Sequence, residues 1–355
     1  MNQKKILHLA NNSKRDPNKF LPDFIRFVQK NFDTKEHLFI FTGPSHGINI
    51  EGENIVFIDE KFGFIERFFF LLKQLLSSKK IILHRLPRGK VLLALHLMPS
   101  LLKKSAWVIW GGDLYKYKDR TKGLNQGSAV QKFLRRRIIS KLGFLATYLP
   151  GDVAYAREWY GAKGTHIECI MYPSNLFTNP AIEPKEASGP ITLQIGNSAN
   201  SRNNHMAILK MLEPYKERDI KIFAPLSYGD MAYGEKVGSC GKELFGEKFV
   251  PLTQFLPLEA YKELLASVDI AIFYSKHQHA MGNIITLLGL GKKVYIMKDT
   301  TPWDLFSRLG VCVFDVEALS LDLINPEIAL KNSAAISKYF SAENLKKQLE
   351  YLFGA

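Results

Sequence analysis

A chain of 355 residues is longer than one ordinary hydrophobic core spans, so we expect two domains of about 150 residues or slightly more. Hydrophobic residues make up 46% of the chain and charged residues 23%, which excludes a disordered protein and is typical of a soluble globular one. The 48 Lys and Arg outnumber the 34 Asp and Glu, and the resulting net charge of +14 favours anionic partners: nucleic acid, anionic lipid or phosphorylated substrates.

The N-terminal segment has too short an apolar core for a signal peptide and is expected to form a first strand. The most apolar segment, 62–76, carries Glu66, Arg67 and Lys73 and is shorter than the ~20 apolar residues of a spanning helix, so no transmembrane span is predicted. The three cysteines are far apart and form no C-x-x-C pair. This predicts neither a disulfide framework nor a zinc site, and a reducing cytoplasm fits best.

Short apolar runs alternate with longer helical patterns, which indicates strand and helix units wound into parallel sheets. In the first half we expect strands at Lys5–Ala10, Leu38–Phe41, Asn54–Ile58, Ile81–His84, Ala106–Trp110, Ala146–Leu149 and His166–Ile170. In the second half we expect strands at Ile191–Ile195, Ile220–Ala224, Lys248–Val250, Asp269–Phe273 and Lys293–Met297. The sequence therefore predicts two open sheets in series.

The segment between Thr178 and Pro190 has several turn formers and no apolar periodicity, so it is predicted to be an exposed connection. We expect a first domain at 1–177, a linker at 178–190 and a second domain at 191–338. The last stretch places Leu345, Leu349 and Leu352 on one stripe and is predicted to be an amphipathic helix. This terminal segment, 339–355, is expected to cross back to the first domain.

A bare polar loop, GNSANSRNNH, begins at Gly196, where the strand 191–195 ends. Ligands of open parallel sheets lie outside the carboxyl ends of the strands, so this loop is a candidate anion site. Gly196 lets the backbone approach closely, Asn197 and Ser198 offer donors, Arg202 adds a guanidinium, and the following helix contributes its partial positive charge. An Asn- and Ser-rich capping turn explains the same residues.

A second junction of this kind follows the strand 269–273, where a helix is expected to begin near Met281. Gly282 and Asn283 place free backbone N–H groups at that helix start, and donors precede it at Lys276, His277, Gln278 and His279. An H-x-H pair can bind a metal, but the sequence offers no third ligand nearby. Two donor-rich loops in one domain predict a diphosphate held between them.

In the first domain, Gly111, Gly112 and Asp113 follow the strand 106–110. The carboxylate of Asp113 is a candidate general base, and an Asx turn or helix cap is the alternative. His84, which closes the strand 81–84, is either a second functional candidate or a structural histidine.

Three segments combine apolar and basic residues: 62–76, 89–104 and 132–141. Aromatic and leucine surface beside Lys and Arg is typical of a protein resting on an anionic bilayer, where each basic group adds about 1 kcal/mol. Core helices with solvated basic faces explain the same residues. The net charge of +14 favours the membrane.

Motifs in a specific order run almost end to end along the chain. They are LH at 83–84, IWGGDLY at 109–115, YPS from Tyr172, IGNSANSRNNH at 195–205, APLSYG from Ala224, EAYKELLASVDIAIF from Glu259 and HQHAMGN from His277, followed by Trp303. In these motifs the sequence resembles glycosyltransferase family 56, whose type member is the TDP-N-acetylfucosamine:lipid II N-acetylfucosaminyltransferase of enterobacterial common antigen.

The resemblance implies a GT-B fold: two facing Rossmann-like domains with parallel sheets, the second binding the nucleotide sugar and the first the acceptor. It implies an inverting transfer from a dTDP-sugar to a polyprenyl-diphosphate-linked acceptor, with no metal and no other cofactor. Helix N-termini and side-chain donors would neutralise the departing diphosphate. It also implies a peripheral enzyme at the cytoplasmic face of the bacterial inner membrane, with an anionic membrane surface as partner.

Asp113 would then deprotonate the acceptor hydroxyl, and His84 would orient the acceptor or serve as the base. Pro225 and Tyr228 would flank the thymine ring. The matching motifs imply substrate contacts from Gly111, Gly112, Tyr172, Gly196, Asn197, Ser198, Arg202, Asn204, His205, Pro225, Tyr228, His277, Gln278, Met281, Gly282 and Asn283. The chain departs from the type member at Ser201 and Arg202, whose order is reversed, and at His277, where that enzyme has Arg. The acceptor could also belong to an O-antigen or capsule pathway.

Two other functions fit parts of the pattern. A nucleotide-sugar epimerase or hydrolase of the same fold would need no lipid. A basic nucleic-acid-binding protein would need a clustered basic stripe with interleaved aromatics, whereas the basic residues here are dispersed. We rank nucleic-acid binding last.

Overall fold

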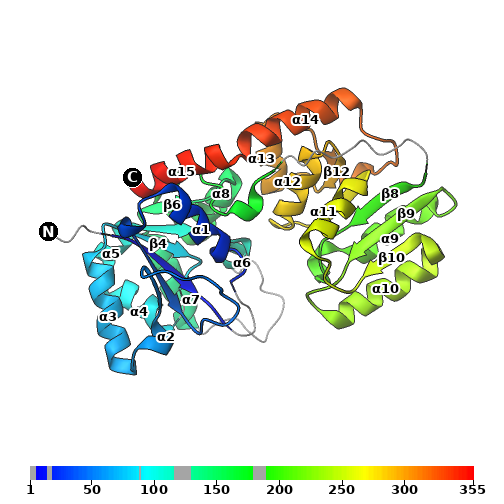
Figure 1. Ribbon diagram of the computed structural model, residues 1–355. Helices are drawn as coiled ribbons and strands as arrows, with labels where there is room; N and C mark the ends of the chain where they lie inside the picture. Colours follow the sequence, from blue (N-terminus) through cyan, green and yellow to red (C-terminus); the bar gives the residue numbers. More distant parts are fainter. Residues whose placement is uncertain (1–4, 14–17, 88, 116–128, 179–188) are drawn as a thin grey trace. The chain divides into compact units, whose positions relative to one another are not determined.

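The computed structural model describes residues 5–13, 18–87, 89–115, 129–178 and 189–355. The chain divides into two compact units, one of Met1–Ser174 with Ala342–Ala355 and the other of Asn175–Ser341. Each unit is built around its own sheet, with helices on the sheet faces (Figure 1). Most of the predicted linker, 179–188, lies outside the described residues.

The first unit contains a seven-stranded sheet of order β3-β2-β1-β4-β5-β6-β7, and every pair in it is parallel. Its strands are β1 (Ile6–Asn11), β2 (His37–Thr42), β3 (Ile55–Phe57), β4 (Lys80–His84), β5 (Ser105–Val108), β6 (Phe144–Ala146) and β7 (Thr165–Ile167). Its helices are α1 (Leu21–Asn31), α2 (Ile58–Lys61), α3 (Phe64–Ser77), α4 (Gly89–Leu97), α5 (Pro99–Lys103), α6 (Gly111–Leu114), α7 (Ala129–Ile139), α8 (Pro150–Tyr160) and α15 (Ala342–Gly354). The near-continuous apolar runs of β1, β2 and β4 are those of strands buried on both faces.

The second unit contains a six-stranded parallel sheet of order β10-β9-β8-β11-β12-β13. Its strands are β8 (Ile191–Ile195), β9 (Ile220–Pro225), β10 (Phe249–Leu252), β11 (Ile270–Phe273), β12 (Lys293–Ile296) and β13 (Phe314–Asp315). Its helices are α9 (His205–Leu212), α10 (Met231–Phe245), α11 (Leu258–Ser267), α12 (Met281–Gly289), α13 (Thr301–Arg308) and α14 (Pro326–Tyr339). Both sheets have the doubly wound strand order of Rossmann-like domains.

The predicted strands are present, with shifted ends. The predictions at 106–110, 146–149 and 166–170 run two or three residues past the ends of β5, β6 and β7. After β6, which begins at Phe144, the apolar residues lead into α8. Thr147 Oγ1 accepts from the backbone N–H of Leu149 at 3.1 Å, and this turn stops the strand. The two-residue strand β13 was not predicted.

The C-terminal helix α15 packs on the first unit. Leu345, Leu349 and Leu352, the predicted stripe, are fully buried. The buried ammonium of Lys80 donates to the carbonyl of Leu352 at 2.8 Å, which satisfies a free carbonyl in the last turn of the helix. Gln348 accepts from the backbone N–H of Ile170 at 2.8 Å. No helix in the described part of the chain is long and apolar enough to span a bilayer.

Candidate functional site

Each sheet has a switch point where the strand order reverses, between β1 and β4 in the first unit and between β8 and β11 in the second. Ligands of open α/β sheets bind outside the carboxyl ends of the strands at such points. In the second unit the loop from Gly196 follows β8 and the loop 274–280 follows β11. Both predicted loops therefore lie at one switch point.

Gly196 adopts a left-handed conformation with φ of +60°, and its N–H donates to the carbonyl of Ile272 at 2.9 Å. A Cβ at Gly196 would lie 2.4 Å from His205 Nε2, so the glycine is required by the close packing of that ring. The helix α9 begins at His205, nine residues after Gly196, and a 3-10 turn at Ser201–Asn203 precedes it. The helix therefore does not follow the glycine directly, because the loop folds back through this turn.

The two loops of the second unit contact each other. Asn204, with φ of +51°, donates its side-chain amide to the carbonyl of Tyr274 at 2.8 Å. Burial, together with the positive charges of Arg202 and His277, lowers the pKa of His279 to about 4. Arg202 of the first loop and His277 of the second thus lie near the same imidazole.

Several of the buried polar atoms without a hydrogen-bond partner in the described part of the chain lie in or beside these loops, and others lie in the first unit. Those at the loops include Asn197 Oδ1, Asn203 Oδ1, His205 Nε2, Gln278 Oε1 and His279 Nδ1. Folded proteins pair nearly all such groups, so this concentration points to a polar ligand at the switch point. Amide and imidazole groups match phosphate oxygens and sugar hydroxyls.

Two tyrosines complete this cluster, and sequence reasoning identified only one of them. Asn197 donates to the hydroxyl of Tyr228 at 3.0 Å, and Asn283, on the first turn of α12, donates to that of Tyr261 at 2.8 Å. Burial raises the pKa of Tyr261 to about 12, so its hydroxyl stays protonated at neutral pH. Tyr261 lies inside a quoted motif, but its helical spacing gave no functional signal.

An exposed aromatic pair lies beyond the carboxyl ends of β9 and β10. Tyr228 stacks on Phe255 with ring centroids 5.9 Å apart and an interplanar angle of 8°, and the two residues are 44% and 65% exposed. Pro225, predicted with Tyr228 to flank a base, is the buried last residue of β9. Phe255 is the residue that stacks on Tyr228.

Other predicted residues of this unit also lie at the carboxyl ends of the strands. Ser198 is buried, and its carbonyl accepts from the amide of Asn203 at 2.9 Å. Met281 begins α12, and Ala280 before it has φ of +55°, an unusual conformation for a residue with a side chain. The carbonyl of Gly282 accepts from Thr286 at 2.9 Å, inside the helix.

In the first unit a buried row of three histidines crosses the sheet. Ring nitrogens of His37 and His8 lie 3.0 Å apart, those of His8 and His84 lie 3.1 Å apart, and His84 Nδ1 lies 2.9 Å from the hydroxyl of Tyr172. Trp110 donates to the same hydroxyl at 3.2 Å. Burial lowers the pKa of His84 to about 3 and that of His37 to about 4, so both are neutral at pH 7.

His84 is thus enclosed, with both ring nitrogens engaged, and Tyr172 lies between it and the indole of Trp110. Burial also raises the pKa of Tyr172 above its usual range. This geometry suits a residue that orients its neighbours.

Asp113 lies in the first turn of α6, and its side chain is 2% exposed. Its Oδ2 accepts from the backbone N–H of Leu86 at 2.9 Å, which ties the segment after β4 to α6. Its Oδ1 lies 3.9 Å from a guanidinium nitrogen of Arg135. The carboxylate therefore makes structural contacts through both oxygens, and its role as a general base stays a prediction.

Arg85 is a residue that sequence reasoning missed. It directly follows β4 at the switch point, and its φ of +84° is a strained conformation for an arginine. Its guanidinium lies 5.3 Å from the ring centroid of Trp110, and a Cβ on Gly112 would lie 3.9 Å from Arg85 Nη2. Gly112, in the first turn of α6, therefore lies beside this cation.

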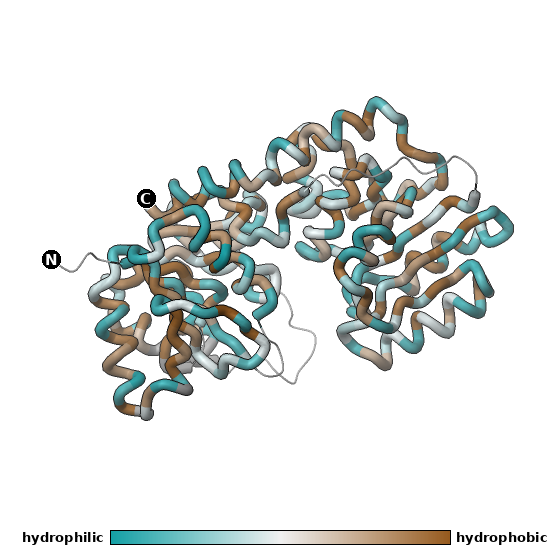
Figure 2. Tube along the Cα trace, viewed as in Figure 1, coloured by the Kyte–Doolittle hydropathy of each residue, from teal (hydrophilic) through white to brown (hydrophobic). Residues whose placement is uncertain are grey.

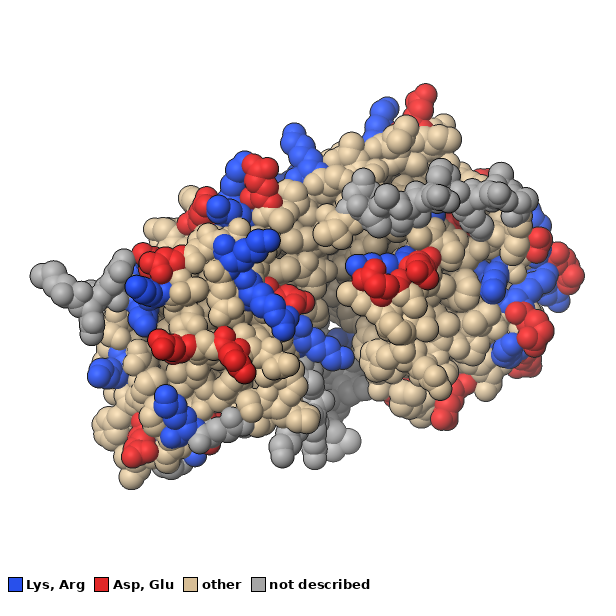
Figure 3. Space-filling model, in the orientation of Figure 1, with Lys and Arg blue, Asp and Glu red and all other residues tan. Residues whose placement is uncertain are grey.

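The described residues contain no group of three or more His, Cys, Asp and Glu placed to hold a metal ion. On the face shown in Figure 3, the described basic and acidic side chains are interspersed over both units.

The family model described as 4-alpha-L-fucosyltransferase glycosyl transferase group 56 matches residues 73–338, most of the chain and nearly all of the second unit. The chain belongs to this family. It is therefore a glycosyltransferase, and the predicted family is confirmed.

Solved structures show that this family 56 glycosyltransferase has the predicted GT-B fold. A glycosyltransferase from Rickettsia africae is 13% identical with a TM-score of 0.64, over 99% of this chain and 98% of that one. HepE from Anabaena, in complex with UDP and glucose, is 12% identical with a TM-score of 0.63, over 98% and 99% of the two chains. WaaG, a glycosyltransferase involved in lipopolysaccharide biosynthesis, is 11% identical with a TM-score of 0.56, over 98% and 97%.

Proposed function

We propose that this glycosyltransferase moves a deoxy-amino sugar resembling N-acetylfucosamine from a dTDP-sugar to a polyprenyl-diphosphate-linked glycan. The acceptor would be an intermediate of a cell-surface polysaccharide: enterobacterial common antigen, O-antigen or capsule. The enzyme would act peripherally at the cytoplasmic face of the inner membrane, where such lipids are assembled.

The cluster of unpartnered polar atoms at the β8–β11 switch point carries this proposal. It lies in the unit that the family model covers almost completely. Arg202 and the N-terminus of α12 would bind the diphosphate of the donor, and Tyr228 with Phe255 would stack on the base. HepE, similar in fold, has been solved with UDP-glucose, which supports a nucleotide sugar as donor.

The reaction would be an inverting displacement that needs no metal and no other cofactor. The acceptor oxygen attacks the anomeric carbon, its proton passes to Asp113, and the bond from that carbon to the diphosphate breaks on the opposite side. Preorganised donors on the departing diphosphate stabilise the charge that develops there, and each is typically worth ~10² or more in turnover. His84 would act through Tyr172, orienting the acceptor.

A thermal-shift panel of dTDP, UDP and GDP tests the donor half of the proposal. A nucleotide at 100 times its dissociation constant adds about 2.7 kcal/mol to the free energy of unfolding, so a clear preference for dTDP is expected. Equal shifts for all three would remove the thymine assignment, and no shift would remove the nucleotide site.

The acceptor half of the proposal is tested by measuring sugar transfer to a polyprenyl-linked acceptor by the Asp113→Asn variant. Asparagine keeps an oxygen that can accept from Leu86, so the fold should survive while the base is lost. Near-normal turnover by the variant would remove Asp113 from its role. Conversion of the nucleotide sugar without any lipid acceptor would indicate an epimerase or hydrolase instead.

A further inference from the structure

Helix α3 exposes a stripe of apolar side chains along its length. Ile65, Phe69 and Leu76 are 68%, 63% and 56% exposed, and Phe68 beside them is 48% exposed. Leu72 lies between Phe69 and Leu76 at helical spacing and is half-buried. Another face of the same helix carries the buried residues Leu71 and Leu75, so the helix is apolar on two sides. Figure 2 shows apolar stretches along α3.

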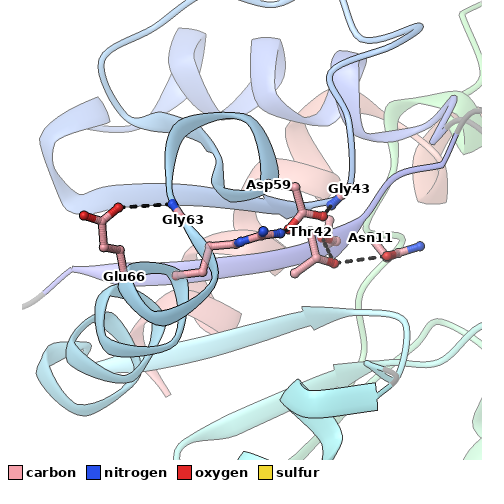
Figure 4. Close-up of polar contacts among 8 residues, drawn as sticks. Asn11, Thr42, Gly43, Asp59, Gly63 and Glu66 are labelled. Atoms are coloured by element: carbon pink, nitrogen blue, oxygen red, sulfur yellow. Dashed lines mark hydrogen bonds and ion pairs between the residues drawn. The ribbon is translucent and has the colours of Figure 1, made fainter.

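The start of α3 is firmly held, so this stripe belongs to a fixed surface. Glu66 accepts from the N–H of Gly63 at 3.1 Å and caps the helix. Arg67 pairs with Asp59, whose second oxygen accepts from the N–H of Gly43 at 2.7 Å (Figure 4). This network joins α3 to the end of β2.

A lysine-lined cleft lies on the flank of α3. Its volume is about 1080 Å³, and its lining includes Lys5, Lys35, Lys61 and Lys73, with Glu53 as an acidic residue. Lys73 lies one turn from both Phe69 and Leu76, so the cleft borders the apolar stripe. A surface helix ordinarily turns polar side chains to solvent, so an exposed apolar stripe beside a basic cleft calls for an explanation.

We propose that α3 is the membrane-docking element of this enzyme, with its stripe in the interfacial layer of an anionic bilayer and its cleft lysines on lipid phosphates. The arrangement fits an interfacial helix, which places apolar side chains among acyl chains and cations at the headgroups. A second copy is a poorer occupant, because a two-fold contact through the stripe would bring the lysines of both copies to one interface. The charge of +14 adds long-range attraction to the same surface.

The inference rests on the proposed lipid-linked acceptor. Flotation with vesicles of phosphatidylcholine, with or without phosphatidylglycerol, tests membrane docking separately from catalysis. The full chain should float with phosphatidylglycerol vesicles, and Ile65→Ser/Phe69→Ser should lose at least tenfold in affinity. Lys61→Gln/Lys73→Gln should lose roughly fivefold for each lysine. The matched control is Leu323→Ser/Leu330→Ser, which removes side chains that are 61% and 72% exposed in the second unit.

Equal flotation of the stripe variant and the control would overturn the proposal. So would a concentration-dependent dimer that Ile65→Ser/Phe69→Ser abolishes while vesicle binding is absent. The stripe variant should keep its dTDP thermal shift and its transfer to a short-chain acceptor in detergent, so a failed donor assignment and a failed docking surface give different results.

Discussion

Gly196 shows how one residue fixes the geometry of the loop that follows β8. Any other residue at this position would be destabilised in two independent ways. Its backbone would be strained at a φ of +60°, and its Cβ would clash with His205 Nε2 at 2.4 Å. Gly196→Ala should therefore lose ~1–2 kcal/mol of stability from backbone strain and a further ~1–3 kcal/mol from overpacking, with weaker nucleotide binding. Chemical denaturation and the dTDP thermal shift measure the two effects.

Gly310→Ala is the matched control for that prediction. Gly310 has φ of +69° in the same unit, but a Cβ there would meet nothing within 4 Å. The control should show only the strain cost and bind nucleotide normally. Equal losses in the two variants would show that His205 yields to the new methyl group.

At the residue scale, the sequence predicted the positions of polar residues that come directly after a predicted strand. The loops at Gly196 and His277 follow predicted strands, so their meeting at one sheet edge could be anticipated. The strained Arg85, the stacked Phe255 and the enclosure of Asp113 could not, because each depends on contacts between segments distant in the sequence. The predicted role of Asp113 as general base stays a prediction.

At the scale of elements, the buried strands could be predicted well because parallel strands read as continuous apolar runs. The prediction fails where an apolar run continues past its strand, as at 147–149, since the run alone does not show that Thr147 closes a turn. The short edge strand β13 has too few residues for any periodic signal.

The docking of α15 rests on a buried charge, so it should be sensitive to one substitution. The ammonium of Lys80 donates to the carbonyl of Leu352 and lies 4.0 Å from the ring centroid of Phe144. Lys80→Ala should lower the free energy of unfolding by about 1.5–3 kcal/mol, the usual range for a charged hydrogen bond. Lys347→Ala, which removes an exposed pair with Glu343, should leave stability unchanged. A loss in both variants, measured by denaturant titration, would contradict this explanation.

At the scale of the whole molecule, both units enclose histidines that must stay neutral. Burial lowers the pKa of His37, His205 and His279 to about 4 and that of His84 to about 3. Burial also holds the pKa of His8 well below its usual range, helped by the two histidines beside it. The histidine row of the first unit and the loops after β8 and β11 therefore share one response to acid.

That response has a definite sign. These pKa values lie below the unfolded value of about 6.5. Between the two values the histidines are therefore protonated in the unfolded chain and neutral in the folded chain. The free energy of unfolding should be highest above pH 6.5 and should fall as the pH drops towards 4. The expected decrease is about 1.4 kcal/mol per pH unit for each proton that the unfolded chain takes up. Denaturant titrations between pH 7.5 and about 5.5 avoid most carboxylate titration. A free energy of unfolding that stays flat over that window would mean that the buried rings accept protons in the folded state.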